Sequence, residues 1–235
     1  VILLINAVHP LDGKGVVRLR SLVANAVAGA NCPVPRTYFT HYYKRFLQFM
    51  NEPAITSNDI VMLGNSLTEG GGDWGKRLGK DNVINRGISG DVAMGIYDRL
   101  HQILPGKPKQ IFLLIGVNDI SHDLSTDSIV NMIEKNVTRI QRESPETKLY
   151  LQSLLPIDES FNRYKKLTNK TYQIPEINDR LKALAKEKKI DFIDLYPLFT
   201  EKGTNVLRKE LTYDGLHLKE EGYKIWVDAI KKKMR

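Results

Sequence analysis

Five short apolar runs recur between residues 59 and 196, and polar or glycine-rich sequence follows each of them. The runs are Ile60–Leu63, Asn82–Asn85, Ile111–Ile115, Leu149–Leu155 and Ile190–Leu195, of which the second is the weakest. Short apolar runs that end at glycine or polar residues are typical of buried strands. Apolar residues at helical spacing fall between them, over 91–104, 129–140, 175–188 and 219–234. Alternating strands and helices predict an α/β fold with five parallel strands covered by helices on both faces.

The first fifty residues break this alternation, so we expect an N-terminal extension over 1–50 and a catalytic domain over 51–235. Val1–Val8 is apolar but too short to span a bilayer, which takes about 20 residues. Leu22–Ala30 precedes Cys32 and weakly resembles a leader sequence. A leader remnant and a small buried element both remain open.

Aromatic residues at helical spacing lie between Tyr38 and Phe46. This pattern predicts a helix that packs on the main domain, in preference to one that binds a ligand. The apolar start favours a periplasmic or extracellular protein over a cytoplasmic one.

Composition narrows the protein class. The chain has 235 residues, of which 42% are hydrophobic and 26% charged, and these values exclude a disordered chain and a polytopic membrane protein. Its one cysteine excludes an internal disulfide and a cysteine-based zinc cluster. The net charge of +8 raises the question of nucleic acid. The densest basic runs, Lys186–Lys189 and Lys231–Arg235, fall at ends of predicted helices, so we expect solvated helix ends and no nucleic-acid partner.

Polar residues that could take part in catalysis follow the predicted strands. In a parallel sheet the ligand site lies beyond the carboxyl ends of the strands. The segments found there are Gly64–Gly70, Arg86–Gly90 and Gly116–Asp119, and Asp214–His217 precedes the last predicted helix.

Ser66, Asp214 and His217 are the candidate catalytic residues. A serine hydroxyl needs a base to take its proton, and histidine is the usual base near neutral pH. An aspartate three residues before a histidine can bind its Nδ1 and stabilise the imidazolium. Acyl transfer also needs donors for an oxyanion, and the candidates are the backbone N–H groups of Ser66 and Gly87 and the side-chain amide of Asn118.

Together these residues resemble the blocks of the SGNH hydrolases, also called the GDSL family. Gly64-Asn65-Ser66-Leu67 resembles the first block, with Asn65 where aspartate is commoner. Gly87, Gly116-x-Asn118-Asp119 and Asp214-x-x-His217 match the other three. Residues around 64–68 and 85–91 look most like the platelet-activating-factor acetylhydrolase and sialate O-acetylesterase branch.

The resemblance implies a three-layer α/β/α sandwich with a flavodoxin-like sheet and a serine esterase without metal or cofactor. It implies Ser66 as nucleophile, His217 as base, Asp214 as orienting group, and Ser66, Gly87 and Asn118 as the oxyanion hole. The implied substrate is a short-chain ester, chiefly acetyl, of a carbohydrate. The alternatives are a lysophospholipase- or thioesterase-type acyl hydrolase and a non-catalytic carbohydrate-binding relative.

Other residues have plainer explanations. Gly70–Arg77 approaches a phosphate-binding loop but has arginine where serine or threonine should bind magnesium, so a nucleotide site is not expected. Trp74 is expected to pack in the core and His122 to lie on the surface. Asp119 is expected to cap or brace its own loop, and Asp91 to cap the helix that follows it.

Overall fold

The computed structural model describes residues 36–234, with side chains from residue 40 onward, and Thr37–Arg235 form one compact unit. Cys32 and the segment that resembles a leader lie outside the described residues, so the leader remains a prediction. None of the described helices is both long and apolar enough to cross a membrane.

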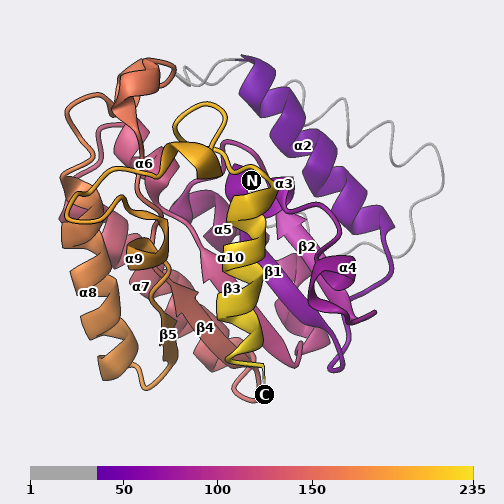
Figure 1. Ribbon diagram of the computed structural model, residues 1–235. Coiled ribbons are helices and arrows are strands. Elements are labelled where there is room, and N and C mark those ends of the chain that lie inside the picture. Colours follow the sequence, from indigo (N-terminus) through magenta and orange to yellow (C-terminus); the bar gives the residue numbers. More distant parts are fainter. Residues whose placement is uncertain (1–35, 235) are drawn as a thin grey trace. The chain divides into compact units, whose positions relative to one another are not determined.

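Five parallel strands form one sheet in the order β2-β1-β3-β4-β5 (Figure 1). The strands are β1 (Ile60–Gly64), β2 (Val83–Gly87), β3 (Gln110–Leu114), β4 (Lys148–Gln152) and β5 (Asp191–Ile193). Gly64 at the end of β1 is level with Gly87 of β2 and Leu114 of β3. Strand β2 lies on one side of β1 and β3 on the other, so the strand order reverses at β1, and ligand sites of such folds lie at this switch point. The predicted α/β class and parallel five-stranded sheet are confirmed.

Helices lie on both sides of the sheet (Figure 1). They are α2 (Arg36–Asn51), α3 (Ser66–Gly70), α4 (Trp74–Leu78), α5 (Ala93–Arg99), α6 (Val117–Ser121), α7 (Thr126–Glu143), α8 (Gln173–Glu187), α9 (Tyr196–Phe199) and α10 (Glu220–Lys231). Neighbouring strand residues point to opposite faces. Val61 and Leu63 join the apolar cluster under α5, α7 and α8, whereas Ile60 and Met62 join the cluster under α4 and α10. Because both faces are covered, the interior strand β1 is buried and apolar throughout instead of alternating.

Two predicted elements differ in length from the observed ones. The helix expected over 91–104 ends at Arg99 and is followed by two 3-10 turns, Leu100–Gln102 and Leu104–Gly106. The strand expected over Leu149–Leu155 ends at Gln152. Beyond it, the Asn178 side chain of α8 bonds both the N–H and the carbonyl of Leu154, at 2.7 and 3.0 Å. A side chain there replaces the hydrogen bonds of a neighbouring strand.

The predicted aromatic helix is α2, and it packs on the rest of the compact unit. Its Phe49 is buried, and the guanidinium carbons of Arg45 and Arg86 each lie 4.6 Å from the centre of the Phe49 ring. Such stacking holds an arginine by its flat face and leaves its N–H groups for other partners. α2 is thereby joined to β2, the edge strand that carries Arg86.

Candidate active site

Ser66 is the first residue of α3, directly beyond the buried strand β1. The preceding Asn65 is buried, and its Oδ1 accepts a hydrogen bond of 3.0 Å from the N–H of Leu67. Asparagine caps a helix start as well as aspartate does. The departure from the commoner family sequence at this position therefore leaves the local geometry of Ser66 intact.

His217 and Asp214 lie on the turn before α10 and face Ser66. His217 Nε2 lies 2.9 Å from Ser66 Oγ, and His217 Nδ1 lies 2.8 Å from Asp214 Oδ2. The other carboxylate oxygen of Asp214 accepts the N–H of His217 at 2.7 Å. The three predicted side chains thus form one continuous chain of hydrogen bonds. It can carry a proton away from the serine hydroxyl and stabilise the resulting positive charge.

Tyr164 is a further member of this hydrogen-bonded group that the sequence analysis missed. Its hydroxyl lies 2.6 Å from Asp214 Oδ2 and 2.9 Å from His217 Nδ1. Burial raises the pKa of the Asp214 carboxyl, but the hydrogen bonds from Tyr164 and His217 outweigh burial and leave that pKa below its usual range. No sequence signal pointed to Tyr164, because it lies 50 residues before Asp214 in an irregular segment.

The Asn118 side chain lies at the start of α6, beyond β3, as predicted. One hydrogen of its amide is donated to the carbonyl of Asp91 at 2.8 Å. The amide carries two hydrogens, so one remains for another acceptor. This bond joins Asn118 to the turn that follows β2.

The structure corrects the prediction for Gly87. Its N–H donates to the side-chain oxygen of Asn85 at 2.8 Å, so the proton is not left for an oxyanion. Gly87 is needed for space instead, since a Cβ there would lie 2.1 Å from the backbone nitrogen of Glu69. Glycine lets α3 approach the end of β2 closely.

Gly90 lies in the same turn, and its N–H remains available as a hydrogen-bond donor. The N–H groups of Ile88, Ser89 and Asp91 donate to Gly64 O, Glu69 Oε2 and Ile88 O, respectively. Among the described residues, the Gly90 N–H has no hydrogen-bond partner. Gly90 has a φ of 81°, a conformation that suits glycine. The glycine of this segment with a free donor is therefore Gly90 and not Gly87.

Asp91 and Asp119 both have roles that differ from the expected ones. Asp91 makes a buried ion pair with Arg99, whose Nε lies 2.9 Å away, and Arg99 also donates to the carbonyl of Gly64 at 3.0 Å. The first residue of α5, Ala93, donates its N–H to Asp119 at 3.1 Å. The prediction that Asp91 caps α5 is thus wrong, and Asp119 binds the start of α5 instead of bracing only its own loop. These contacts tie the ends of β1 and β3 to the turn after β2.

Asp119 gives a prediction for the pH dependence of stability. Burial raises its pKa to about 7, so the folded state favours the protonated carboxyl. The contribution of this carboxyl to the free energy of unfolding is fully present below its pKa in the unfolded chain, near 3.8. That contribution is lost as the pH rises towards 7. We expect the free energy of unfolding of Asp119→Asn to rise relative to that of wild type between pH 5 and pH 8. Because one pKa unit corresponds to about 1.4 kcal/mol, the gain should be at most a few kcal/mol. Denaturant unfolding of both proteins at the two pH values measures this. An equal pH dependence of stability in wild type and Asp119→Asn would contradict a raised pKa for Asp119.

The remaining sequence candidates do not lie among these contacts. Trp74 is buried, and its indole N–H donates to Thr68 O at 2.9 Å, so its predicted packing role is confirmed. His122 is exposed, as expected, and its Nδ1 lies 2.7 Å from the carbonyl of Asn118. Arg77, at the end of the loop that approaches a phosphate-binding pattern, pairs with Glu220 at 2.6 Å. Within residues 36–234, no group of three or more histidine, cysteine or acidic side chains could hold a metal ion.

Comparison with known proteins agrees with this fold. A model of the GDSL-like lipase/acylhydrolase family matches residues 62–225. The chain is 26% identical over 208 residues to the GDSL esterase/lipase At5g62930 of Arabidopsis thaliana, covering 75% of this chain and 85% of that protein. It is also 26% identical over 177 residues to the N-acylneuraminate cytidylyltransferase of Escherichia coli O18:K1:H7 (strain RS218 / NMEC). That match covers 74% of this chain but only 39% of the cytidylyltransferase.

Solved structures share the fold. A structure from Streptococcus pneumonia described as a platelet activating factor superposes with a TM-score of 0.77 at 24% identity, over 93% of this chain and 99% of the other. The acetyl xylan esterase AlAXEase superposes with a TM-score of 0.63 at 22% identity, over 75% of this chain and 100% of the other. At these identities the likeness shows the fold. With the family match over more than half of its length, the chain belongs to the GDSL-like lipase/acylhydrolase family and is an ester hydrolase.

Proposed function

We propose that the protein cleaves esters through an acyl-enzyme on Ser66. The observation that carries this proposal is the hydrogen-bonded chain from Ser66 Oγ through His217 to Asp214. Ser66 Oγ attacks the ester carbonyl carbon while its proton passes to His217 Nε2. The imidazolium then gives that proton to the leaving alcohol, and the carbon–oxygen bond to the alcohol breaks. Water repeats the sequence on the acyl-enzyme, releasing the carboxylic acid and restoring Ser66.

The oxyanion of each tetrahedral intermediate is stabilised by three donors in this proposal. They are the N–H of Ser66, the N–H of Gly90 and the second amide hydrogen of Asn118. The turn N–H groups around Gly90 are occupied, and Asn118 is held beside Gly90 by its bond to the Asp91 carbonyl. Donors fixed in advance stabilise developing charge without reorganising during the reaction.

The substrate we propose is an acetyl ester of a carbohydrate. The relative named acetyl xylan esterase supports the acetyl group. The relative named for N-acylneuraminate, an acidic sugar, and the net charge of +8 support a sugar that carries a negative charge. The Tyr213 ring lies nearly parallel to the His217 imidazole, with centroids 6.0 Å apart, and is 61% exposed. Such an exposed aromatic face beside the triad suits the apolar face of a sugar ring.

Activity on a series of p-nitrophenyl esters, from acetate to dodecanoate, tests the acyl preference. We expect kcat/KM to be largest for acetate and to fall steadily with chain length. A maximum at octanoate or longer would instead support a lysophospholipase- or thioesterase-type acyl hydrolase. Release of acetate from O-acetylated sialic acid and from acetylated xylan, compared side by side, then distinguishes acidic from neutral sugars.

The Tyr164 hydroxyl is expected to influence the pH dependence of this mechanism through Asp214. In Tyr164→Phe, Asp214 loses a hydrogen bond that favours its carboxylate, so its pKa rises and protonation disables it at higher pH. A hydrogen bond to a charged group is stronger than one between neutral groups, so its loss should be measurable. We therefore expect the acidic limb of kcat/KM to move to higher pH. Tyr172→Phe removes an exposed hydroxyl from the same segment and should leave the limb in place. If the rate of Tyr164→Phe falls but the acidic limb of kcat/KM stays in place, Tyr164 has only a packing role.

A further inference from the structure

Glu69, in α3, holds the turn that carries Gly90. Its Oε2 accepts two hydrogen bonds from Ser89, from the N–H at 2.6 Å and from the hydroxyl at 2.7 Å. Ser89 directly precedes Gly90, and Glu69 lies one helical turn after Ser66. One carboxylate therefore links the helix that begins with Ser66 to the turn after β2.

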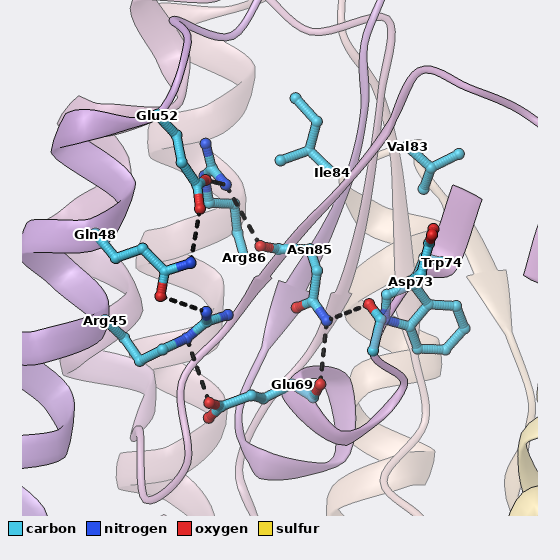
Figure 2. A pocket seen from close by; sticks show the side chains of 11 residues that line it. Arg45, Gln48, Glu52, Glu69, Asp73, Trp74, Val83, Ile84, Asn85 and Arg86 are labelled. Atoms are coloured by element: carbon cyan, nitrogen blue, oxygen red, sulfur yellow. Dashed lines mark hydrogen bonds and ion pairs between the residues drawn. The ribbon is translucent and has the colours of Figure 1, made fainter. Parts of the chain in front are cut away.

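α2 binds the same carboxylate from the other side. His41 Nε2 lies 3.0 Å from both carboxylate oxygens of Glu69, and Arg45 Nε lies 3.3 Å from Oε1. Arg45 Nη2 also donates to the carbonyl of Gly87 at 3.2 Å. Figure 2 shows Arg45 reaching from α2 towards Glu69. Both residues line a cavity of about 530 Å³.

These contacts keep Glu69 charged and immobile. Burial raises the pKa of its carboxyl, but hydrogen bonds from Ser89 and His41 outweigh burial and leave the pKa below its usual range. The Glu69 side chain is 20% exposed, and an acceptor that is partly removed from water and pairs with the cationic Arg45 makes strong hydrogen bonds.

The Gly90 N–H belongs to the peptide between Ser89 and Gly90, so its direction depends on how the residues on both sides of it are held. Glu69 fixes the Ser89 side of the turn, and Asn118 fixes the carbonyl of Asp91 on the other side. Gly90 has no side chain and a positive φ, so its own backbone is the most easily rotated part of the turn. A shift of about 1 Å in a catalytic group can cost 10²-fold in rate.

We propose that Glu69 is a positioning residue for the oxyanion donor on the turn, and that His41 and Arg45 make α2 a functional part of the active site. α2 lies before residues 62–225, the span matched by the family model. This inference rests on the proposed acyl-enzyme mechanism.

Glu69→Gln tests the proposal, with Glu52→Gln as the matched control. Both substitutions remove one negative charge from the lining of the same cavity, but Glu52 pairs with Arg86 and does not contact the turn. Active sites are counted with diethyl p-nitrophenyl phosphate, which releases one nitrophenolate per reactive serine. Per active site, we expect kcat for p-nitrophenyl acetate to fall about 10- to 100-fold in Glu69→Gln, with KM within about twofold.

Affinity for phenylboronic acid, which forms a tetrahedral adduct on the serine, should fall in parallel with kcat. In Glu52→Gln both quantities should stay at the wild-type level. A Glu69→Gln protein with fewer active sites but an unchanged kcat per site would show a structural role only and overturn the proposal.

Arg45→Ala and His41→Gln test the contribution of α2, and they decide the matter if Glu69→Gln does not fold. Lys44→Ala is the control for Arg45→Ala, since it removes the same charge from an exposed position on the same helix. We expect a several-fold loss of kcat per site in both test variants and none in Lys44→Ala. Full activity in both would exclude a role for α2.

Failure of the acyl-enzyme mechanism and failure of the proposed role of Glu69 would give different results. Full activity in Ser66→Ala would remove the acyl-enzyme mechanism itself. An inactive Ser66→Ala protein together with unchanged Glu69→Gln kinetics would remove only the role of Glu69.

Discussion

Replacing Ser66 with alanine is expected to lower kcat for p-nitrophenyl acetate by about 10⁴- to 10⁶-fold, the range seen when a triad serine is removed. The reason is geometric, since the only hydroxyl that lies 2.9 Å from His217 Nε2 in the described part of the chain is that of Ser66. Without it, His217 has no nucleophile to deprotonate and no acyl-enzyme can form. Ser66 is only partly buried and starts a helix capped by Asn65, so the unfolding temperature should change little.

The control for this experiment is Ser160→Ala, which removes an exposed serine hydroxyl far along the chain from Ser66. It should keep wild-type kinetics. Mass spectrometry of the wild-type protein during turnover should find acetyl on the peptide that contains Ser66. A Ser66→Ala protein that retains more than a tenth of the wild-type rate would refute the nucleophile assignment.

Asn118→Ala is expected to have the second largest effect, a loss of about 10²- to 10³-fold in kcat with little change in KM. The amide donates one hydrogen to the Asp91 carbonyl at 2.8 Å, and that bond aims its second hydrogen. An oxyanion exists only in the tetrahedral intermediate, so the lost donor affects kcat and not the binding of the ester. Stopped-flow or steady-state kinetics on p-nitrophenyl acetate measure both constants.

Asn131→Ala, on an exposed position of α7, is the matched control and should be fully active. Asn118→Asp separates charge from geometry, because a carboxylate keeps the shape but offers no donor and repels the oxyanion. We expect it to be at least as impaired as Asn118→Ala. An unchanged kcat in Asn118→Ala would remove Asn118 from the oxyanion hole.

The sheet was predictable because its signal is local. Five apolar runs predicted five strands, and the observed strands overlap all of them. The errors fell at element ends, where a distant residue decides. The strand at Leu149 stops early because Asn178 of α8 takes over its hydrogen bonds. Asp119, and not the adjacent Asp91, accepts the N–H at the start of α5.

The site was predictable where its residues are close in sequence or directly follow a strand. Asp214 and His217 are three residues apart, and a turn of that length brings the carboxylate to the imidazole. Ser66 and Asn118 each follow a strand of a parallel sheet, and the carboxyl ends of such strands share one edge.

By itself the sequence thus predicted the fold class, the order of strands and helices along the chain and the grouping of Ser66, His217 and Asp214. Only the tertiary structure decided which backbone N–H groups remain free, since Gly87 and Gly90 look equally suitable in the sequence. Their difference depends on Asn85, which takes the Gly87 proton, and on the close approach of α3. Tyr164 and Glu69 were found in the same way, because packing joins them to residues 50 and 20 positions away. A hydrogen bond between distant residues leaves no periodic trace in the chain, so only the folded arrangement reveals it.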